Sequence, residues 1–474
     1  MIADLKPYAE YKESGLTWLG KVPTHWQIAR SKRLFTPRKE LARPDDVQLS
    51  ATQAYGVIAQ SLYEERSGYR VVKISMHLDK RRHVEADDFV ISMRSFQGGL
   101  ERAWQTGAIR SSYVVLKPDA QVDPTYFRYL LKSAPYISAL RSTADFIRDG
   151  QDLNYSNFCD VDLLLIPPTE QAAIGRFLAS ANGQFERAIQ AKRKVIALLN
   201  EQKQAIIHRA VTRGLDPSVC LKPSGIPWLG DIPRHWEGLQ VRRVVSFVTS
   251  GSRGWANYYS DDGLIFLQSG NLGRSMSLNL SYVQHVRPPE GAEGERTRVR
   301  KDDVLVCVTG ALTGNVAIVD QDLPFAAFVN QHVALIRPKQ RMVEPRFLAY
   351  VLHSEVGRTQ FKTNEYGGTK QGLGLGDVKS VFIPVPPLAQ QGAIFERLDA
   401  EVARFKEATS RLEREIDLLC EYRTRLVADV VTGKLDVREA AARLPDLPAA
   451  PEAELTSEPF DDSGIPDDIE AEDA

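Results

Sequence analysis

The segment SGIPWLGDIPRHW at residues 224–236 repeats, in slightly changed form, a segment near the start of the chain. Residues 14–26 read SGLTWLGKVPTHW, and eight of the thirteen positions are identical. The copies lie 210 residues apart and keep two Trp, a Gly and a Pro-x-His-Trp run at the same offsets. An internal repeat of this kind predicts a duplicated architecture, which constrains the fold more than any single motif does.

A second repeat links the two halves at an offset of 220 residues. AVTRGLD at 210–216 aligns with VVTGKLD at 430–436, and QAAI at 171–174 aligns with QGAI at 391–394. Each glutamine follows an apolar run and prolines, as in LLLIPPTEQ at 163–171. Proline just ahead of a periodic stretch is a helix-start signal. The chain therefore predicts two equivalent long helices.

These helices are predicted at residues 170–213 and 388–433. Their apolar residues recur in steps of three and four, which gives the 3.5-residue period of a coiled coil. We expect the helices to pair along about forty residues, or ~60 Å; the alternative is two separate amphipathic helices, each on its own domain. The apolar seam positions are Leu178, Phe185, Ile189, Ile196, Leu199, Ile206 and Ala210, then Leu398, Phe405, Thr409, Ile416, Leu419, Leu426 and Val430. The intervening seam positions are Asn182, Lys192 and Lys203, then Val402, Leu412 and Arg423.

The order of the repeats is circular. In the middle of the chain, helix, VTRGLD and SGIPWLG follow one another, whereas VTGKLD near the end would meet SGLTWLG only if the chain ends were joined. This predicts a pseudo-two-fold molecule with its ends close together. The predicted division of the chain is a first domain with the repeat segment at 1–169, the helix at 170–213, a second domain with its repeat segment at 214–387, the helix at 388–433, and a disordered acidic tail at 434–474.

Two diverged globular segments, about 28–165 and 238–382, lie between the repeats. They share a thin scaffold in which DDFVISM at 87–93 parallels DDVLVCV at 302–308, while YVVLKP at 113–118 parallels VALIRP at 333–338. Short strand-like runs with one or two helices predict mixed α/β domains.

Composition is compatible with a DNA partner. The 474 residues suggest two or three domains. The net charge is −1, but residues 441–474 carry −10, which leaves +9 for residues 1–440. The four Cys are scattered, the start of the chain lacks a signal-peptide pattern, and no apolar stretch could span a membrane. We therefore expect a cytoplasmic protein.

Together these features resemble the specificity subunit of type I restriction–modification systems. The resemblance rests on the paired SG-x-x-WLG-x-x-P-x-HW segments, the Pro-rich helix entries that end in Gln, and the VT-x-x-LD helix exits, up to about residue 436. It implies two target recognition domains, each reading one half of a split sequence in double-stranded DNA, on an antiparallel coiled coil that sets their spacing. It also implies two methyltransferase subunits and a translocating endonuclease subunit as partners.

The resemblance further implies a subunit without catalytic activity. No cofactor is expected in this chain, and S-adenosylmethionine, ATP and Mg²⁺ are expected in the partner subunits. The repeated Trp18, Trp26, Trp228 and Trp236 are candidates for docking two identical partners. The alternative is that these tryptophans staple each domain onto its own helix.

Candidate DNA-reading residues are the Arg, Lys, Asn and Gln side chains of Gly-rich loops, with Tyr and Thr neighbours. In the second domain they are Arg253, Asn257, Tyr258, Gln268, Asn271, Arg274, Thr313, Asn330, Gln331, Lys370 and Gln371. In the first domain they are Arg94, Gln97, Arg102, Arg148 and Gln151. Arg81, Arg82 and His83 are predicted to form a solvated face.

No catalytic motif is recognisable. The chain has no P-loop, no Asn-Pro-Pro-Tyr run and no His spacing typical of a metal site, so we expect no metal. Two alternatives remain: a stand-alone DNA-binding regulator with a coiled-coil spacer, and a nuclease. A regulator would not need a repeated docking segment, and no acidic-plus-Lys cluster supports a nuclease.

Overall fold

The structure is a computed structural model that describes residues 5–71, 80–92, 95–143, 154–251, 254–273, 275–287, 296–323, 325–365 and 372–445. The chain divides into two compact units. Unit 1 combines Met1–Arg193 with Glu413–Ala474, and unit 2 is Lys194–Leu412. Unit 1 therefore unites the two ends of the chain, as the circular order of the repeats predicts. Among the described helices, none is long and apolar enough to cross a membrane.

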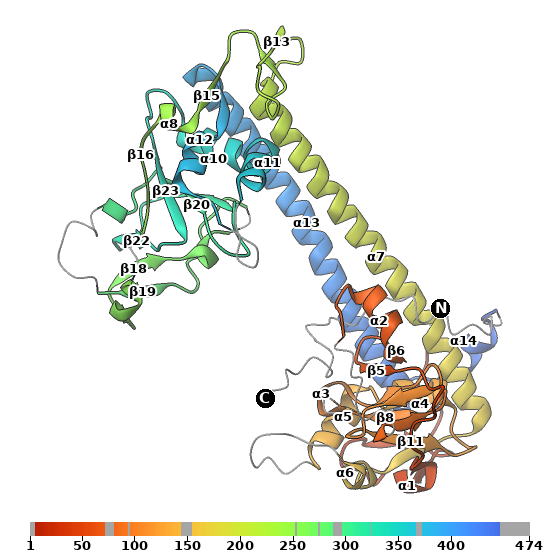
Figure 1. Cartoon of the computed structure of the whole chain (residues 1–474). Helices are drawn as coiled ribbons and strands as arrows, with labels where there is room; N and C mark the ends of the chain where they lie inside the picture. Colours follow the sequence, from red (N-terminus) through yellow and green to blue (C-terminus); the bar gives the residue numbers. More distant parts are fainter. Residues whose placement is uncertain are drawn as a thin grey trace. The chain divides into compact units, whose positions relative to one another are not determined.

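Each unit is built on the same four-stranded antiparallel sheet (Figure 1). In unit 1 the order is β4-β11-β8-β9, and in unit 2 it is β16-β23-β20-β21. The two segments that the sequence aligned occupy the two central strands of both sheets, which confirms the predicted mixed α/β scaffold. The strands are β4 Phe35–Pro37, β8 Phe89–Ile91, β9 Glu101–Arg102 and β11 Val114–Pro118, then β16 Val245–Ser250, β20 Val304–Cys307, β21 Val316–Ile318 and β23 Val333–Pro338.

The repeated segments fold alike in the two units. Each forms a two-stranded hairpin and then a strand that pairs with the residues just before the next long helix. A short helix follows each of these strands. The elements are β1 Tyr11–Glu13, β2 Lys21–Pro23, β3 Gln27–Ala29 with β12 Leu163–Leu165, and α1 Ser31–Leu34; then β13 Leu221–Pro223, β14 Asp231–Pro233, β15 Glu237–Gln240 with β24 Phe382–Val385, and α8 Val241–Val244.

Helices complete the core of each unit, while other strands differ between the units. The shared helices are α4 Pro124–Leu130, α5 Ala134–Arg141 and α6 Tyr155–Cys159 in unit 1, and α10 Pro345–His353, α11 Glu355–Asn364 and α12 Leu375–Ser380 in unit 2. Unit 1 adds β5 Leu49–Thr52, β6 Gly56–Ala59, α2 Gln60–Ser67, β7 Arg82–Val84, α3 Ser95–Gly98 and β10 Gly107–Ile109. Unit 2 adds η3 Trp255–Tyr258, β17 Tyr259–Ser260, β18 Leu264–Leu267, η4 Ser269–Asn271, β19 Gln284–Val286 and β22 Ala327–Val329.

The two predicted long helices are present as α7, Pro168–Arg213, and α13, Leu388–Val431. In unit 1 the first part of α7 packs against the last part of α13, with Leu178 and Leu426 in one core. Lys192 Nζ lies 2.6 Å from Glu415 Oε2, and Glu186 accepts a hydrogen bond from Arg423. Since the residue numbers rise along α7 as they fall along α13, the pairing is antiparallel.

In unit 2 the last part of α7 packs against the first part of α13. Ile207 and Leu398 share the core of this unit, and both are at most 2% exposed. Every predicted apolar seam residue of the two helices is buried or half-buried. The 3.5-residue period in the sequence therefore identified the packed face of both helices.

The N-terminal segment closes onto the end of α13 within unit 1. Lys6 forms a β-bridge with Asp436. The structure also places residues 434–445 in the fold, rather than in the disordered tail that composition predicted. Residues Arg438–Ala442 form α14, and Val437 and Ala441 are fully buried because both are apolar and reach the core of unit 1. The acidic residues 446–474 lie outside the described residues.

Candidate functional site

Side-chain hydrogen bonds attach the first repeated segment to the start of α7. Trp26 is fully buried, and its Nε1 donates to Glu170 Oε1 at 3.1 Å. His25 Nε2 lies 2.8 Å from the other oxygen of that carboxylate, and Tyr8 donates its hydroxyl hydrogen to Oε1 at 2.5 Å. Glu170 lies in the first turn of α7, where the helix dipole stabilises a negative charge. The repeated His-Trp pair thus holds a helix N-terminus.

The second copy has the same geometry at the start of α13. Trp236 Nε1 donates to Gln390 Oε1 at 2.9 Å, and His235 Nε2 lies 2.9 Å from the same oxygen. Gln390 stands 220 residues after Glu170, so the repeat offset also holds for the partner of the His-Trp pair. An amide oxygen replaces the carboxylate, and the arrangement of the rings is retained.

A pair of buried glutamines makes a second equivalent contact. Gln171 Nε2 donates to the carbonyls of Gln121 and Ile166, and its Oε1 accepts from Asp123 N at 2.8 Å. Gln391 repeats this pattern with Met342, Pro386 and Glu344. Both glutamines are 0% exposed. A buried amide is costly unless its donors and acceptor are satisfied, so these contacts define how each domain meets its helix.

The burial of Trp26 and Trp236 against the long helices corrects the docking role that the sequence predicted for them. Trp26 and Trp236 are 0% and 1% exposed, because each indole fills the core beside the end of a long helix. A Cβ on Gly433 would lie 2.8 Å from Trp26, and one on Gly214 would lie 3.2 Å from Trp236. Both glycines have positive φ and end a helix, so they allow the indole to approach.

The other two repeated tryptophans are more accessible. Trp228 is 38% exposed. Trp18 is half-buried and packs edge-to-face on Tyr136, with ring centroids 6.1 Å apart. Of the four candidates, only these two offer indole surface to another molecule.

Two leucines that the seam analysis did not select are candidates for subunit contact. Leu198 is 53% exposed and Leu418 is 63% exposed. They occupy equivalent positions at the 220-residue offset, one on α7 in unit 2 and one on α13 in unit 1. Each precedes a half-buried seam leucine, so the repeated Leu-Leu pair was the available sequence signal. A single exposed leucine is ordinary on a protein surface. The match between the two positions is what suggests a contact, because two equivalent contacts would require the same side chain at both positions.

The DNA-reading candidates of unit 2 divide by exposure. Asn257 is exposed and Tyr258 is 42% exposed. Gln268 is half-buried, and its Nε2 donates to the hydroxyl of Tyr259 at 3.1 Å. Gln331 is also half-buried, and its amide Nε2 lies 3.0 Å from a ring nitrogen of the neighbouring histidine. Asn257 and Tyr258 are thus the most accessible of the described candidates.

Three other candidates of unit 2 have local structural roles. Asn271 is 5% exposed, and its amide donates to the carbonyls of Asn279 and Tyr282. Asn330 is also 5% exposed, and its oxygen accepts a backbone hydrogen bond within its own turn. Thr313 donates its hydroxyl hydrogen to Gly310 O at 2.6 Å. Buried asparagines bonded in this way shape the loops and cannot read base edges, which corrects the prediction for Asn271 and Asn330.

In unit 1, Gln97 is exposed and Arg102 is half-buried. Arg102 is held by Asp87 at 2.6 Å and lies over the ring of Trp104, with its guanidinium carbon 4.6 Å from the centroid. The side chain of Gln97 is therefore accessible to another molecule, whereas that of Arg102 is held against its own domain. Arg94, Arg148, Gln151, Arg253, Arg274, Lys370 and Gln371 lie outside the described residues.

A cavity of about 530 Å³ lies between domain and helices in unit 1. Trp104 is in its wall, and the guanidinium of Arg128 lies 5.1 Å from the indole centroid on which Arg102 also lies. Lys132 and Glu101 form a salt bridge of 2.7 Å in the same wall. Arginines stacked on an indole are suited to planar or anionic ligands. Neither Trp104 nor Arg128 was selected from the sequence, although Trp104 ends the Gly-rich stretch at 93–104 that contains Gln97 and Arg102.

Unit 2 has a cavity of about 520 Å³ at the corresponding place, and its walls carry Lys203, His353 and Arg358. Lys203 stands 220 residues before Arg423, which lines the cavity of unit 1. Burial and the nearby Arg358 lower the pKa of Lys203. Burial, followed by the charges of Arg358 and Lys203, lowers the pKa of His353 from 6.5 to about 4.

The lowered pKa of His353 predicts that unit 2 loses stability in acid. His353 accepts a hydrogen bond from Arg358 at 3.3 Å and stays neutral in the folded chain until pH falls to about 4. Between pH 6.5 and 4 the unfolded chain binds more protons, so stability falls as pH falls through this window, by about 3 kcal/mol at its lower end. The melting temperature of His353→Gln should depend less steeply on pH than that of the wild type. Equal slopes for the two proteins would contradict the assignment.

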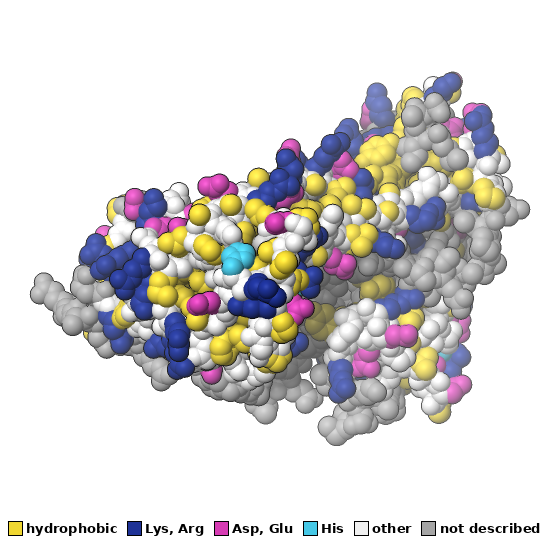
Figure 2. Space-filling view, turned by 90° about the horizontal axis from the view of Figure 1, so that it is seen from above, with side chains coloured by type: hydrophobic (Ala, Val, Ile, Leu, Met, Phe, Trp, Pro, Cys, Tyr) yellow, Lys and Arg dark blue, Asp and Glu magenta, His cyan; other side chains and the backbone are white. Residues whose placement is uncertain are grey.

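Among the described side chains, those that are charged form no single band on the face shown in Figure 2. Lys and Arg are spread among Asp, Glu and hydrophobic side chains there.

Comparisons with known proteins agree with this architecture. Residues 292–417 match the family model described as the type I restriction modification DNA specificity domain. The chain is 23% identical over 340 residues to the type I restriction enzyme EcoBI specificity subunit of Escherichia coli, covering 70% of each chain. It is 21% identical over 452 residues to the putative type I restriction enzyme MjaX specificity subunit of Methanocaldococcus jannaschii, covering 90% of this chain and 98% of that one.

The fold is also that of a solved structure. A chain from a study of complex assembly and conformational transition of the type I R-M system matches with a TM-score of 0.60 and 16% sequence identity. The match covers 87% of this chain and 99% of that chain. The duplicated domains with two long helices are therefore an arrangement already observed in another protein.

Proposed function

We propose that this chain, which is similar over most of its length to specificity subunits of type I restriction enzymes, is the DNA sequence-specificity subunit of such a system. The observation that carries the proposal is the duplication itself. Each unit has the same sheet order, and each domain is latched to the start of a long helix through an equivalent Trp and an equivalent Gln. Two diverged domains that are attached to the long helices through equivalent contacts suit an asymmetric, bipartite DNA target.

In this proposal each domain reads one half-site in double-stranded DNA, and the paired helices set the spacing between the half-sites. Asn257 and Tyr258 in unit 2 and Gln97 in unit 1 are the described candidates with the most accessible side chains. Amide side chains can read base edges, and tyrosine hydroxyls can hold phosphates. Residues of the adjoining loops that lie outside the described residues remain candidates on the basis of the sequence.

The chain is proposed to act without catalysis, in the cytoplasm, as a partner of two methyltransferase subunits and an endonuclease subunit. S-adenosylmethionine, ATP and Mg²⁺ would then be bound by those subunits. The similarity to specificity subunits favours this role over a stand-alone regulator, for which no observation speaks.

Deletion of the gene tests the proposal directly. Methylated bases are mapped across the genome with and without this chain, in a strain whose methyltransferase subunit is active. The expected result is loss of one split, asymmetric methylation motif, restored by a plasmid copy. An unchanged methylation pattern would refute the proposal, and tight repression of a promoter by the chain alone would support a regulator.

The exposed leucines predict where the methyltransferase subunits bind. Leu198→Glu and Leu418→Glu each place a charge on one of two equivalent surfaces, so each variant should bind one methyltransferase subunit rather than two, and the double variant none. Loss of a central apolar contact costs about 2 kcal/mol, or roughly thirtyfold in affinity. Light scattering after size exclusion measures the stoichiometry. Leu215→Glu, at a leucine that is 46% exposed and outside both helices, is the control and should bind two subunits. Full binding by the double variant would contradict the prediction.

A further inference from the structure

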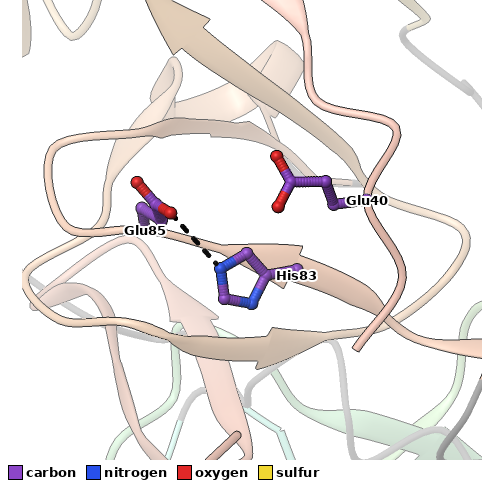
Figure 3. Close-up of side chains that lie close together, drawn as sticks. All are labelled: Glu40, His83 and Glu85. Carbon is purple, nitrogen blue, oxygen red and sulfur yellow. Dashed lines mark ion pairs between the residues drawn. The ribbon is translucent and has the colours of Figure 1, made fainter. Parts of the chain in front are cut away.

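A cluster in unit 1 combines residues that no proposed function has used. One side-chain atom each of Glu40, His83 and Glu85 lies within 4.8 Å of the other two (Figure 3). Glu40 follows β4, His83 lies on β7, and Glu85 directly follows that strand. This cluster could not be predicted from the sequence, because more than forty residues separate Glu40 from the other two.

The burial of this region also differs from the sequence prediction of a solvated face at residues 81–83. Arg81 is 6% exposed and His83 is 0% exposed. His83 lies at the centre of β7, which pairs with β10, and the next residue of the strand, Val84, is also 0% exposed.

The hydrogen bonds of His83 define which ring nitrogen can accept. Its Nδ1 lies 2.8 Å from Oδ2 of Asp46, and a carboxylate oxygen accepts hydrogen bonds, so Nδ1 carries the hydrogen. Nε2 is buried and has no hydrogen-bond partner. It faces Glu85, whose Oε1 lies 3.7 Å away, beyond hydrogen-bond distance (Figure 3). In the tautomer with a bare Nε2, the imidazole directs a lone pair at a carboxylate, and a cation between these two acceptors would satisfy both.

The charges linked by these ion pairs also favour a cation. Arg38 and Arg43 supply two positive charges, whereas Glu40, Glu85, Asp46 and Asp88 supply four negative charges. With His83 neutral, this network has a net charge of −2. One divalent cation would balance it.

The two arginines leave coordination sites on the carboxylates. Arg38 is bound mainly to Asp88, at 2.6 and 3.0 Å. Its distance to Glu85 is 3.6 Å, as is that of Arg43, so the Glu85 oxygens accept no close hydrogen bond from either. Each oxygen of Glu40 accepts one arginine hydrogen bond, at 2.9 and 3.0 Å. Because a carboxylate oxygen has two lone pairs, one stays available on each.

We propose that Glu40, His83 and Glu85 bind a divalent first-row transition metal ion, of which Zn²⁺ fits best. Imidazole nitrogen with two carboxylate oxygens is a common zinc ligand set, and ligands about 2.1 Å from a tetrahedral ion lie about 3.4 Å apart. The 3.7 Å between His83 and Glu85 is close to that value, and Glu40 needs a small side-chain movement.

The surroundings suit such a site. Asp46 orients the imidazole through Nδ1, as carboxylates commonly do behind histidine ligands of metals. Glu40 and Glu85 are 51% and 46% exposed, so an ion can enter from solvent. Once bound, it would tie the segment after β4 to β7.

Titration of the untagged full chain with Zn²⁺, and with Co²⁺ as a spectroscopic probe, tests the proposal. We expect one ion per chain, a visible d–d absorption from Co²⁺, and a higher melting temperature with Zn²⁺. His83→Gln and Glu85→Gln should each weaken binding at least tenfold, and Asp46→Asn should weaken it 10- to 100-fold. His285→Gln changes a half-buried histidine of unit 2 and should leave binding unchanged.

Two results would overturn the proposal. One is the absence of binding at 100 μM metal (roughly the upper end of a useful site), which would mean that His83 Nε2 simply carries a proton toward Glu85. The other is unchanged binding by Glu85→Gln, whose half-exposed side chain can be replaced without unfolding the domain. The readouts do not involve DNA, so failure of the proposed specificity function would not affect them.

Discussion

Replacing residues 28–165 with the corresponding domain of another specificity subunit is expected to change one half of the methylated motif completely. The exchange points fall in β3 and β12, which pair with each other at the base of the domain. Trp26 and Glu170 lie outside the exchanged segment, so their contact at the start of α7 is retained. Gln171 also stays, and the new domain has to supply the backbone groups that replace those of Gln121 and Asp123. The other domain and both helices are untouched. The second half-site and the spacer length should therefore stay the same in the methylation map.

The reciprocal exchange is the matched control for this experiment. Replacing residues 238–382, bounded by β15 and β24, should change only the other half of the motif. If either exchange altered both halves, the domains would not read independently. If neither altered the motif, recognition would reside outside the globular domains.

Trp236→Ala is expected to destabilise unit 2 by about 3–5 kcal/mol, the range for removing a large buried aromatic side chain. The indole is 1% exposed and packs beside Gly214, and its loss would also remove the hydrogen bond to Gln390. Trp228→Ala, eight residues earlier in the same repeat, removes an indole that is 38% exposed and should cost about 1 kcal/mol or less. Because the chain has two units, hydrogen-exchange protection of β20 and β23 is a more specific readout than global melting.

Equal losses of stability for Trp236→Ala and Trp228→Ala would contradict the structural role of the buried Trp236. A larger loss for Trp228→Ala would mean that the exposed member of the repeat is the structural one. The comparison is internally controlled, because both substitutions remove the same side chain from the same segment.

The sequence predicted the long helices well because their packing follows a simple period. The seam residues from Leu178 to Ala210 and from Leu398 to Val430 all lie on the packed face. The shared sheet could be predicted from two short alignments, because the aligned apolar runs form the central strands, of which β8 and β20 are fully buried. The predicted start of the tail, residue 434, is too early, because Val437 and Ala441 pack in the core of unit 1.

The candidate site was less predictable, because the type of a residue does not determine whether its side chain is exposed. Asn271 and Asn330 have the chemistry of base readers, but both are buried and bonded to the backbone of their own loops. Trp104 and Arg128 line a cavity, but neither has the side-chain type and loop position by which candidate base readers were selected. Similarly, the repeated tryptophans were equally good candidates for docking until burial separated them.

The sequence alone determined the duplication, its circular order, the helix period and the family resemblance, because these properties depend on spacing along the chain. Only the tertiary structure decided which repeated side chains are core and which are surface, and which distant residues meet. Trp26 with Glu170, and Glu40 with His83, are more than forty residues apart in sequence, and only the folded chain brings each pair together. Such contacts arise from packing that conforms to no local period, so they could be seen only in three dimensions.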